Sequence, residues 1–195
     1  MHNQVVIKCG PRTASSRLES AYLLQGYTGF LLDTPKKYSK VNRLGFSKPY
    51  VIKDHTKYWI PKKIKKYKLI HLKRKNVFEQ AMSKIVVHTL KDKVNFNPYH
   101  PRHDDIIDVQ PWKLTIDEVA QAIRSTQEST DITSQVLKNI PHTVIYTEDI
   151  VKDDNLIIEL TGGKPNYDEP HFTVRSRLTP RSIISNYDEL KKYFD

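Results

Sequence analysis

Segments typical of buried strands alternate with segments typical of helices along the chain, and this alternation constrains the fold more than any other feature. Apolar runs bounded by turn or charged residues predict strands, and apolar residues at helical spacing predict helices. The predicted strands span residues 4–8, 49–53, 67–72 and 142–146, and the predicted helices span about residues 16–24, 76–90, 115–139, 153–162 and 186–194. Such alternation favours a central parallel sheet with helices on both faces, so we expect a three-layer α/β/α fold.

Length and composition predict one globular domain. The 195 residues, of which 38% are hydrophobic, suffice for one core without disulfides. No apolar run approaches the roughly 18 residues of a membrane span. Cys9 is the one cysteine of the sequence, which excludes an internal disulfide and a cysteine-based zinc site. We therefore expect a single domain over residues 1–195, cytoplasmic and without a metal.

The charge balance indicates an anionic partner. The sequence has 32 Lys and Arg against 22 Asp and Glu, a formal net charge of +10. A surface of this sign attracts anions. Most of the excess lies within residues 36–75, whereas residues 104–168 are nearly balanced. Two interpretations stay open, a site for a small polyanion and a basic face that binds nucleic acid non-specifically.

The loop from Gly10 to Ser16, between the first predicted strand and the first helix, is a candidate anion site. Its small residues allow backbone N–H groups to point at an anion, and Ser15 and Ser16 add hydroxyl donors at a helix N-terminus. Arg12 adds a planar cation. The loop lacks the GxxxxGK[ST] pattern of a Walker A motif. A simple helix cap by Ser15 or Ser16 explains the same residues without a ligand.

Polar residues also follow the next two predicted strands. Lys53-Asp54-His55 ends the second one, and a histidine there could act as a general base near neutral pH or be merely polar surface. Arg74 ends the third, and Ser83 lies on the following helix, so both could bind one phosphate. In a parallel α/β sheet, ligands bind beyond the carboxyl ends of the strands, which is where all three groups fall.

Taken in order, these segments resemble the sulfotransferases that use 3′-phosphoadenosine 5′-phosphosulfate (PAPS). The family loop P-[KR]-[ST]-[GA]-[ST]-[ST] is matched by Pro11-Arg-Thr-Ala-Ser-Ser16, and the Lys-Thr-His of its cytosolic branch is similar to Lys53-Asp-His55. The family also has an Arg at the next strand end and a Ser on the next helix. Further similar segments are Tyr146-Thr-Glu-Asp-Ile150, which matches Tyr-Glu-Asp-Leu, and the closing Ile184-Ser-Asn-Tyr-Asp-Glu-Leu190.

The resemblance implies a P-loop NTPase-like sulfotransferase fold. It also implies transfer of a sulfuryl group from PAPS to a hydroxyl or amine of an acceptor, which we expect to be a carbohydrate or a small molecule. It implies no specific nucleic acid, membrane or metal partner. The 5′-phosphosulfate would be held by the loop residues Arg12, Thr13, Ala14, Ser15 and Ser16.

The resemblance also implies roles outside the loop. Arg74 and Ser83 would hold the 3′-phosphate, and Arg175 and Arg177 would close over the nucleotide. His55 would be the base, with Lys53 and Arg12 as electrophilic partners. Bacterial and Golgi-type members often use a carboxylate after the first helix, which makes Asp33 the alternative base. Residues 99–103 and Trp112 are candidates for the acceptor pocket by position.

Three other functions stay open at this level. A nucleotide kinase-like P-loop protein would share the architecture, although the Walker lysine is missing. A non-catalytic basic protein that binds nucleotides or nucleic acid would explain the charge and the eleven tyrosines. A degenerate sulfotransferase fold could bind PAPS or a sulfated glycan without turnover.

Overall fold

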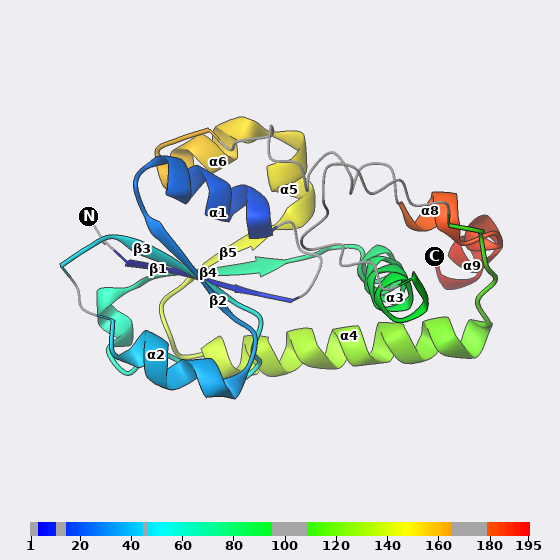
Figure 1. The fold of residues 1–195 in the computed structure, drawn as a ribbon, viewed down its shortest axis with the longest axis horizontal. Helices are drawn as coiled ribbons and strands as arrows, with labels where there is room; N and C mark the ends of the chain where they lie inside the picture. Colours follow the sequence, from blue (N-terminus) through cyan, green and yellow to red (C-terminus); the bar gives the residue numbers. More distant parts are fainter. Residues whose placement is uncertain (1–3, 11–14, 45–46, 95–108, 165–178) are drawn as a thin grey trace. The chain divides into compact units, whose positions relative to one another are not determined.

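The computed structural model describes residues 4–10, 15–44, 47–94, 109–164 and 179–195 (Figure 1). The chain divides into two compact units. The first comprises Met1–Lys75 and Glu128–Asn166, and the second comprises Asn76–Gln127 and Tyr167–Asp195. The expectation of a single domain over the whole chain stays a prediction.

The first unit is built on a five-stranded sheet in which every pairing is parallel. Its strands lie in the order β2-β3-β1-β4-β5, so β1 is central. The register places Lys8 of β1 beside Asp54 of β3, and Cys9 of β1 beside Leu72 of β4. The strands are β1 (Gln4–Cys9), β2 (Thr28–Leu32), β3 (Tyr50–Asp54), β4 (Lys68–Lys73) and β5 (Thr143–Tyr146).

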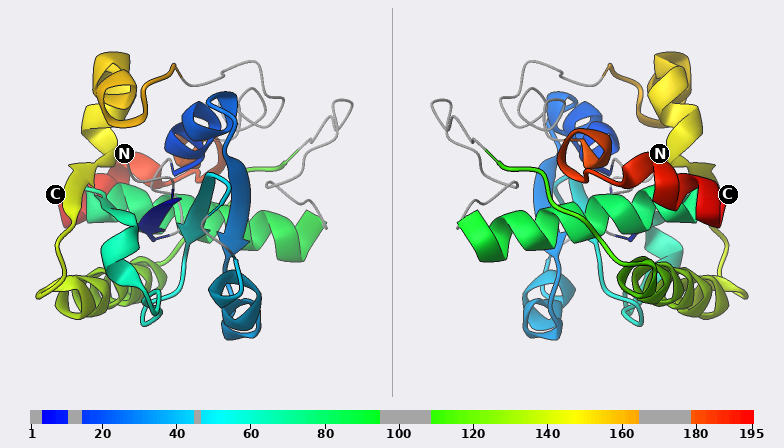
Figure 2. Two further views of the ribbon diagram at one scale, coloured as in Figure 1. Left: turned by 90° about the vertical axis from the view of Figure 1, so that its left-hand side faces the viewer. Right: turned by 90° about the vertical axis from the view of Figure 1, so that its right-hand side faces the viewer.

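Helices cover one face of this sheet because alternate strand residues on that face are apolar. Val5 and Ile7 of β1 pack there with Leu18 of α1 and Ile157 of α6 in a single core. Figures 1 and 2 show α1 and α6 together on this side of the sheet. The elements of this layer are α1 (Ser15–Leu24), α5 (Thr147–Lys152) and α6 (Asp154–Thr161).

The opposite face has a core of its own. Val6 of β1 packs there with Val41 of α2, Trp59 of the β3–β4 connection and Leu137 at the end of α4. With helices on both faces, the unit is α/β and compatible with a three-layer α/β/α fold, as the alternation predicted. The helices of this layer are α2 (Tyr38–Asn42) and the last part of α4 (Ile116–Leu137), and the short 3-10 helices η1 (Pro35–Lys37) and η2 (Ile64–Lys66) flank β3.

The second unit is helical. Phe78 of α3 packs against Tyr187 and Phe194 of α9, and the Tyr187 hydroxyl donates a hydrogen bond to Glu79. Its elements are α3 (Val77–Val94), the first part of α4, α8 (Pro180–Ile183) and α9 (Tyr187–Phe194). In the part of the chain that the structure describes, no helix combines the length and apolar character needed to cross a bilayer.

Two helix ends are set by local features of the sequence. Gly26, which follows α1, has φ of +81°, a left-handed conformation that glycine adopts without strain. Thr115 and Glu118 form a capping box at the start of α4, because the Glu118 carboxylate accepts from the Thr115 backbone N–H at 2.7 Å and the Thr115 hydroxyl accepts from the Glu118 backbone N–H at 3.2 Å.

The sequence patterns missed β2, α2, α5 and α8. Thr28 and Gly29 open β2 on the edge of the sheet, where they are exposed, so the strand has neither a buried apolar run nor a clean alternation. Helices α2, α5 and α8 have five, six and four residues, too few for a helical periodicity to show.

Candidate functional site

The carboxyl ends of β3, β1 and β4 lie next to one another, because these strands are neighbours in a parallel sheet. The chain leaves β1 toward β2 on one side, and it leaves β4 toward β5 on the other. Such a reversal of direction opens a crevice between the two strand ends, and α/β proteins bind ligands there. The three polar groups identified in the sequence follow β1, β3 and β4, so the structure brings their strand ends together at this edge.

Lys53 at the end of β3 reaches onto the first turns of α1. Its Nζ lies 3.5 Å from the Ser16 hydroxyl and forms an ion pair with the Glu19 carboxylate. The Lys53 and Glu19 side chains are only 14% and 17% exposed. The Glu19 carboxylate also lies near Gly29 of β2, where a Cβ would stand 3.4 Å from Glu19 Oε1. A cation is therefore held beside the N-terminus of the helix that follows the central strand.

His55 and Asp33 lie near Lys53. The His55 backbone N–H donates to the Leu32 carbonyl at 2.8 Å, which fixes the chain after β3 against the end of β2. The imidazole Nε2 is buried and has no hydrogen-bond partner among the described residues. Burial and, to a smaller extent, the Lys53 charge lower the pKa of His55 to about 4, against the opposing effect of the Asp33 charge. The ring is therefore neutral at pH 7 and can accept a proton.

Asp33 has the opposite character. It is 39% exposed and its Oδ1 accepts a hydrogen bond from Lys37 Nζ at 2.8 Å. That hydrogen bond is the main cause that lowers the pKa of Asp33 below its ordinary value. Of the two candidate bases, Asp33 is thus an ionised, solvated carboxylate and His55 is a half-buried neutral ring.

Arg74 and Lys75, which follow β4, are held by the first turn of α5. Arg74 Nε lies 3.6 Å from a Glu148 carboxylate oxygen, and Glu148 also accepts the Lys75 backbone N–H at 2.9 Å. Lys75 Nζ pairs with Asp149 at 2.6 Å. The segment that resembled Tyr-Glu-Asp-Leu therefore places its two carboxylates on the cations at the end of β4.

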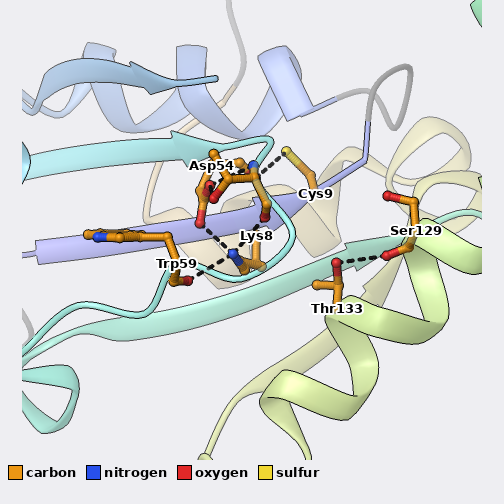
Figure 3. A network of polar contacts seen from close by, with 7 residues as sticks. Lys8, Cys9, Asp54, Trp59, Ser129 and Thr133 are labelled. Atoms are coloured by element: carbon orange, nitrogen blue, oxygen red, sulfur yellow. Dashed lines mark hydrogen bonds and ion pairs between the residues drawn. The ribbon is translucent and has the colours of Figure 1, made fainter. Parts of the chain in front are cut away.

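Asp54, the middle residue of the Lys53-Asp54-His55 segment, points to the other face of the sheet (Figure 3). The Lys8 ammonium lies 2.7 Å from Asp54 Oδ2 and donates to the carbonyls of Thr56 and Trp59 at 2.7 and 2.9 Å. Both charged side chains are almost fully buried. This network ties the β3–β4 connection to β1, so it holds the backbone that carries Lys53 and His55.

Several predicted site residues are not placed at this edge. Arg12, Thr13, Ala14, Arg175, Arg177 and residues 99–103 lie outside the described residues. Ser83 belongs to α3 of the second unit, so its distance from Arg74 is not fixed. Trp112 is also in the second unit, where its backbone pairs with Ile183 and Ser185.

Sequence reasoning missed Glu19, Glu148 and Lys8. Glu19 stands three residues after Ser16 and was visible as the sole acidic residue of the first helix, but its partner depends on how α1 packs on β3. Lys8 was interpreted as the end of an apolar strand, because the sequence around it contains no pattern that indicates a buried ion pair.

Comparison with models of known protein families gives no match, and comparison with curated proteins gives none either. In the described residues, no group of three or more His, Cys, Asp and Glu side chains is arranged to hold a metal ion.

Proposed function

We propose that this protein is a PAPS-dependent sulfotransferase with a P-loop-like fold. The observation that carries the proposal is the position of Lys53. Its ammonium lies beside Ser16 at the N-terminus of α1, the helix that follows the central strand of a parallel sheet. A helix N-terminus favours anions through its free N–H groups and its dipole, and a partly buried cation next to it adds to that preference.

The donor contacts follow from this arrangement. Ser15, Ser16 and Lys53 would bind the 5′-phosphosulfate, together with the loop residues Arg12, Thr13 and Ala14. Arg74 at the neighbouring strand end would bind the 3′-phosphate, with Ser83 of α3 and with Arg175 and Arg177 of the late loop. Ser83, the loop residues and the two late arginines enter from the sequence resemblance alone.

The reaction is an in-line displacement at sulfur. The acceptor oxygen or nitrogen forms a bond to sulfur, and the bond from sulfur to the 5′-phosphate oxygen breaks, which releases adenosine 3′,5′-bisphosphate. The acceptor proton goes to the base, His55 in our proposal and Asp33 in the alternative. Lys53, Arg12 and the N–H groups of α1 stabilise the negative charge that develops on the leaving oxygen.

The same edge also suits a nucleotide kinase, so the assay must separate the two. Purified protein is incubated with PAPS that carries labelled sulfate and with a panel of phenols and oligosaccharides. We expect transfer to at least one acceptor, inhibition by adenosine 3′,5′-bisphosphate, and loss of transfer in Lys53→Met. Phosphate transfer from ATP, without sulfate transfer from PAPS, would overturn the proposal in favour of the kinase.

A further inference from the structure

The ion pair between Lys53 and Glu19 stands where the proposed nucleotide must bind. Both side chains are mostly buried, and the pair touches Ser16 in the first turn of α1. The other cation of that turn, Arg17, points elsewhere, because its guanidinium donates to the carbonyls of Ile150 and Val151. Lys53 is therefore the described cation that is directed at this helix end, and it already has a partner.

Glu19 opposes an anion at this place in two ways. Its carboxylate lies one turn along α1 from Ser16, and at such short range a negative charge repels a phosphate group. It also occupies Lys53, whose positive charge an incoming phosphate needs.

We propose that Glu19 is a positioning residue that holds Lys53 at the edge of the site in the nucleotide-free protein, and that nucleotide binding takes Lys53 from Glu19. The inference rests on the proposed function and adds a regulator of affinity to that same site. Glu19 keeps Lys53 in place at the cost of weaker binding, so its removal makes the site bind anions more tightly. A merely structural glutamate would not have this effect, since its loss would weaken binding or leave it unchanged.

The test measures dissociation constants by titration calorimetry for two probes, adenosine 3′,5′-bisphosphate and inorganic pyrophosphate. Glu19→Gln is expected to bind the bisphosphate about 3- to 10-fold more tightly than the wild type, because one nearby negative charge is gone. Lys53→Met is expected to bind it about 10- to 100-fold more weakly, the loss of a charged hydrogen bond. Glu19→Asp, which keeps the charge and can still pair with Lys53, should stay within about twofold of the wild type.

Two comparisons control for net charge and for folding. Glu159→Gln removes an exposed carboxylate of α6 and should change affinity less than twofold. The same Glu19→Gln change is repeated in Lys53→Met, where the ion pair is removed as a unit and no buried charge is left behind. There too the carboxylate's removal should tighten binding, which keeps the test valid if Glu19→Gln alone does not fold.

The outcomes separate this inference from the proposed function. If pyrophosphate binds more tightly to Glu19→Gln while the bisphosphate does not bind at all, the role of Glu19 stands and the sulfotransferase proposal fails. If the bisphosphate binds and Glu19→Gln leaves its affinity unchanged or weaker, the role of Glu19 is wrong and the proposed function survives. If neither probe binds to any variant, both are overturned.

Discussion

His55 is a half-buried residue whose imidazole Nε2 is shielded from solvent, and this environment changes its chemistry. A histidine in water has a pKa near 6.5, but burial lowers the pKa of this one to about 4. A general base acts in its deprotonated form, so a rate that depends on His55 should be constant from pH 7 down to about 5 and fall as the pH drops through about 4. The pH profile of kcat/KM for sulfate transfer measures this directly.

Replacing the residue gives a second measurement of its role. His55→Ala should lower sulfate transfer by about 10²- to 10⁴-fold, the usual contribution of a general base. Its affinity for adenosine 3′,5′-bisphosphate should stay within about threefold, because Ser16, Lys53 and Arg74 remain. The contradicting result is the reverse pattern, in which Asp33→Asn abolishes sulfate transfer and His55→Ala does not. That pattern would assign the base to Asp33.

At the residue level, the sequence indicated which side chains follow the strands but not what holds them. Ser16, Lys53 and Arg74 were identified from their places next to apolar runs. The carboxylates that pair with the last two, Glu19 and Glu148, come from other elements. Such pairings depend on how helices lie over the sheet, and no local pattern contains that information.

At the level of elements, the buried strands and the edge strand β5 were predicted, but the edge strand β2 was not. β1 and β4 are covered on both faces, so they read as continuous apolar runs. β2 is mostly exposed and contains Gly29, which removes the signal on which such a prediction depends. The order β2-β3-β1-β4-β5 also lay beyond the sequence, because alternation indicates parallel pairing but not which strands are neighbours.

The pairing of β1 with the chain after β3 depends on the buried Lys8–Asp54 contact. Lys8→Met should lower the free energy of unfolding by about 3–5 kcal/mol, since it leaves the Asp54 carboxylate buried without a counter-ion. Adding Asp54→Asn should restore at least half of that loss, because the amide oxygen can still accept the Thr56 hydrogen bonds. Urea unfolding of the three proteins checks the prediction, and equal stability of Lys8→Met and wild type contradicts it.

β4 contains a second histidine with an unusual pKa. Burial, aided by the charges of Lys73, His142 and Lys8, lowers the pKa of His71 to about 3, and its Nδ1 has no hydrogen-bond partner among the described residues. Between pH 6.5 and about 3 the unfolded chain therefore binds a proton that the folded chain does not. The free energy of unfolding is therefore unaffected by protonation of His71 above pH 6.5 and decreases as the pH drops through that window.

A variant without the imidazole tests this dependence. His71→Leu should lose less stability than the wild type when the pH is lowered from 7 to about 4.5, as measured by the thermal midpoint at each pH. His88→Gln serves as the matched control, because His88 is exposed on α3. Parallel pH curves for the wild type and His71→Leu would show that His71 does not titrate in this way.

For the molecule as a whole, the charge separates into two regions of the first unit. At the carboxyl edge of the sheet, Lys53, Arg74 and Lys75 are each paired with a carboxylate. Residues 34–78 contain a single acidic residue, Asp54, which is buried against Lys8. The lysines around η2 directly precede β4 and so lie at the amino edge, away from the candidate site, and the exposed ones are Lys62, Lys63, Lys65 and Lys66.

This separation predicts that the two regions can be changed independently. Replacing these four lysines with glutamine should leave bisphosphate affinity within about twofold. The same change should weaken binding to non-specific DNA and flatten its dependence on salt, because fewer counter-ions are released. Fluorescence titrations with a labelled duplex at several salt concentrations measure both. Selective DNA binding that resists high salt would instead favour a nucleic-acid-binding function.

We propose that the carboxyl edge of the sheet binds a nucleotide with a 3′-phosphate. Thermal stabilisation of the protein by adenosine 3′,5′-bisphosphate, compared with AMP and ATP, tests this binding. At a hundredfold excess over its dissociation constant, a ligand adds about 2.7 kcal/mol to the folded state. We predict this stabilisation for the bisphosphate, little for AMP, and a selective loss of bisphosphate binding in Arg74→Ala. Equal stabilisation by the bisphosphate and AMP would show that this edge does not recognise a 3′-phosphate.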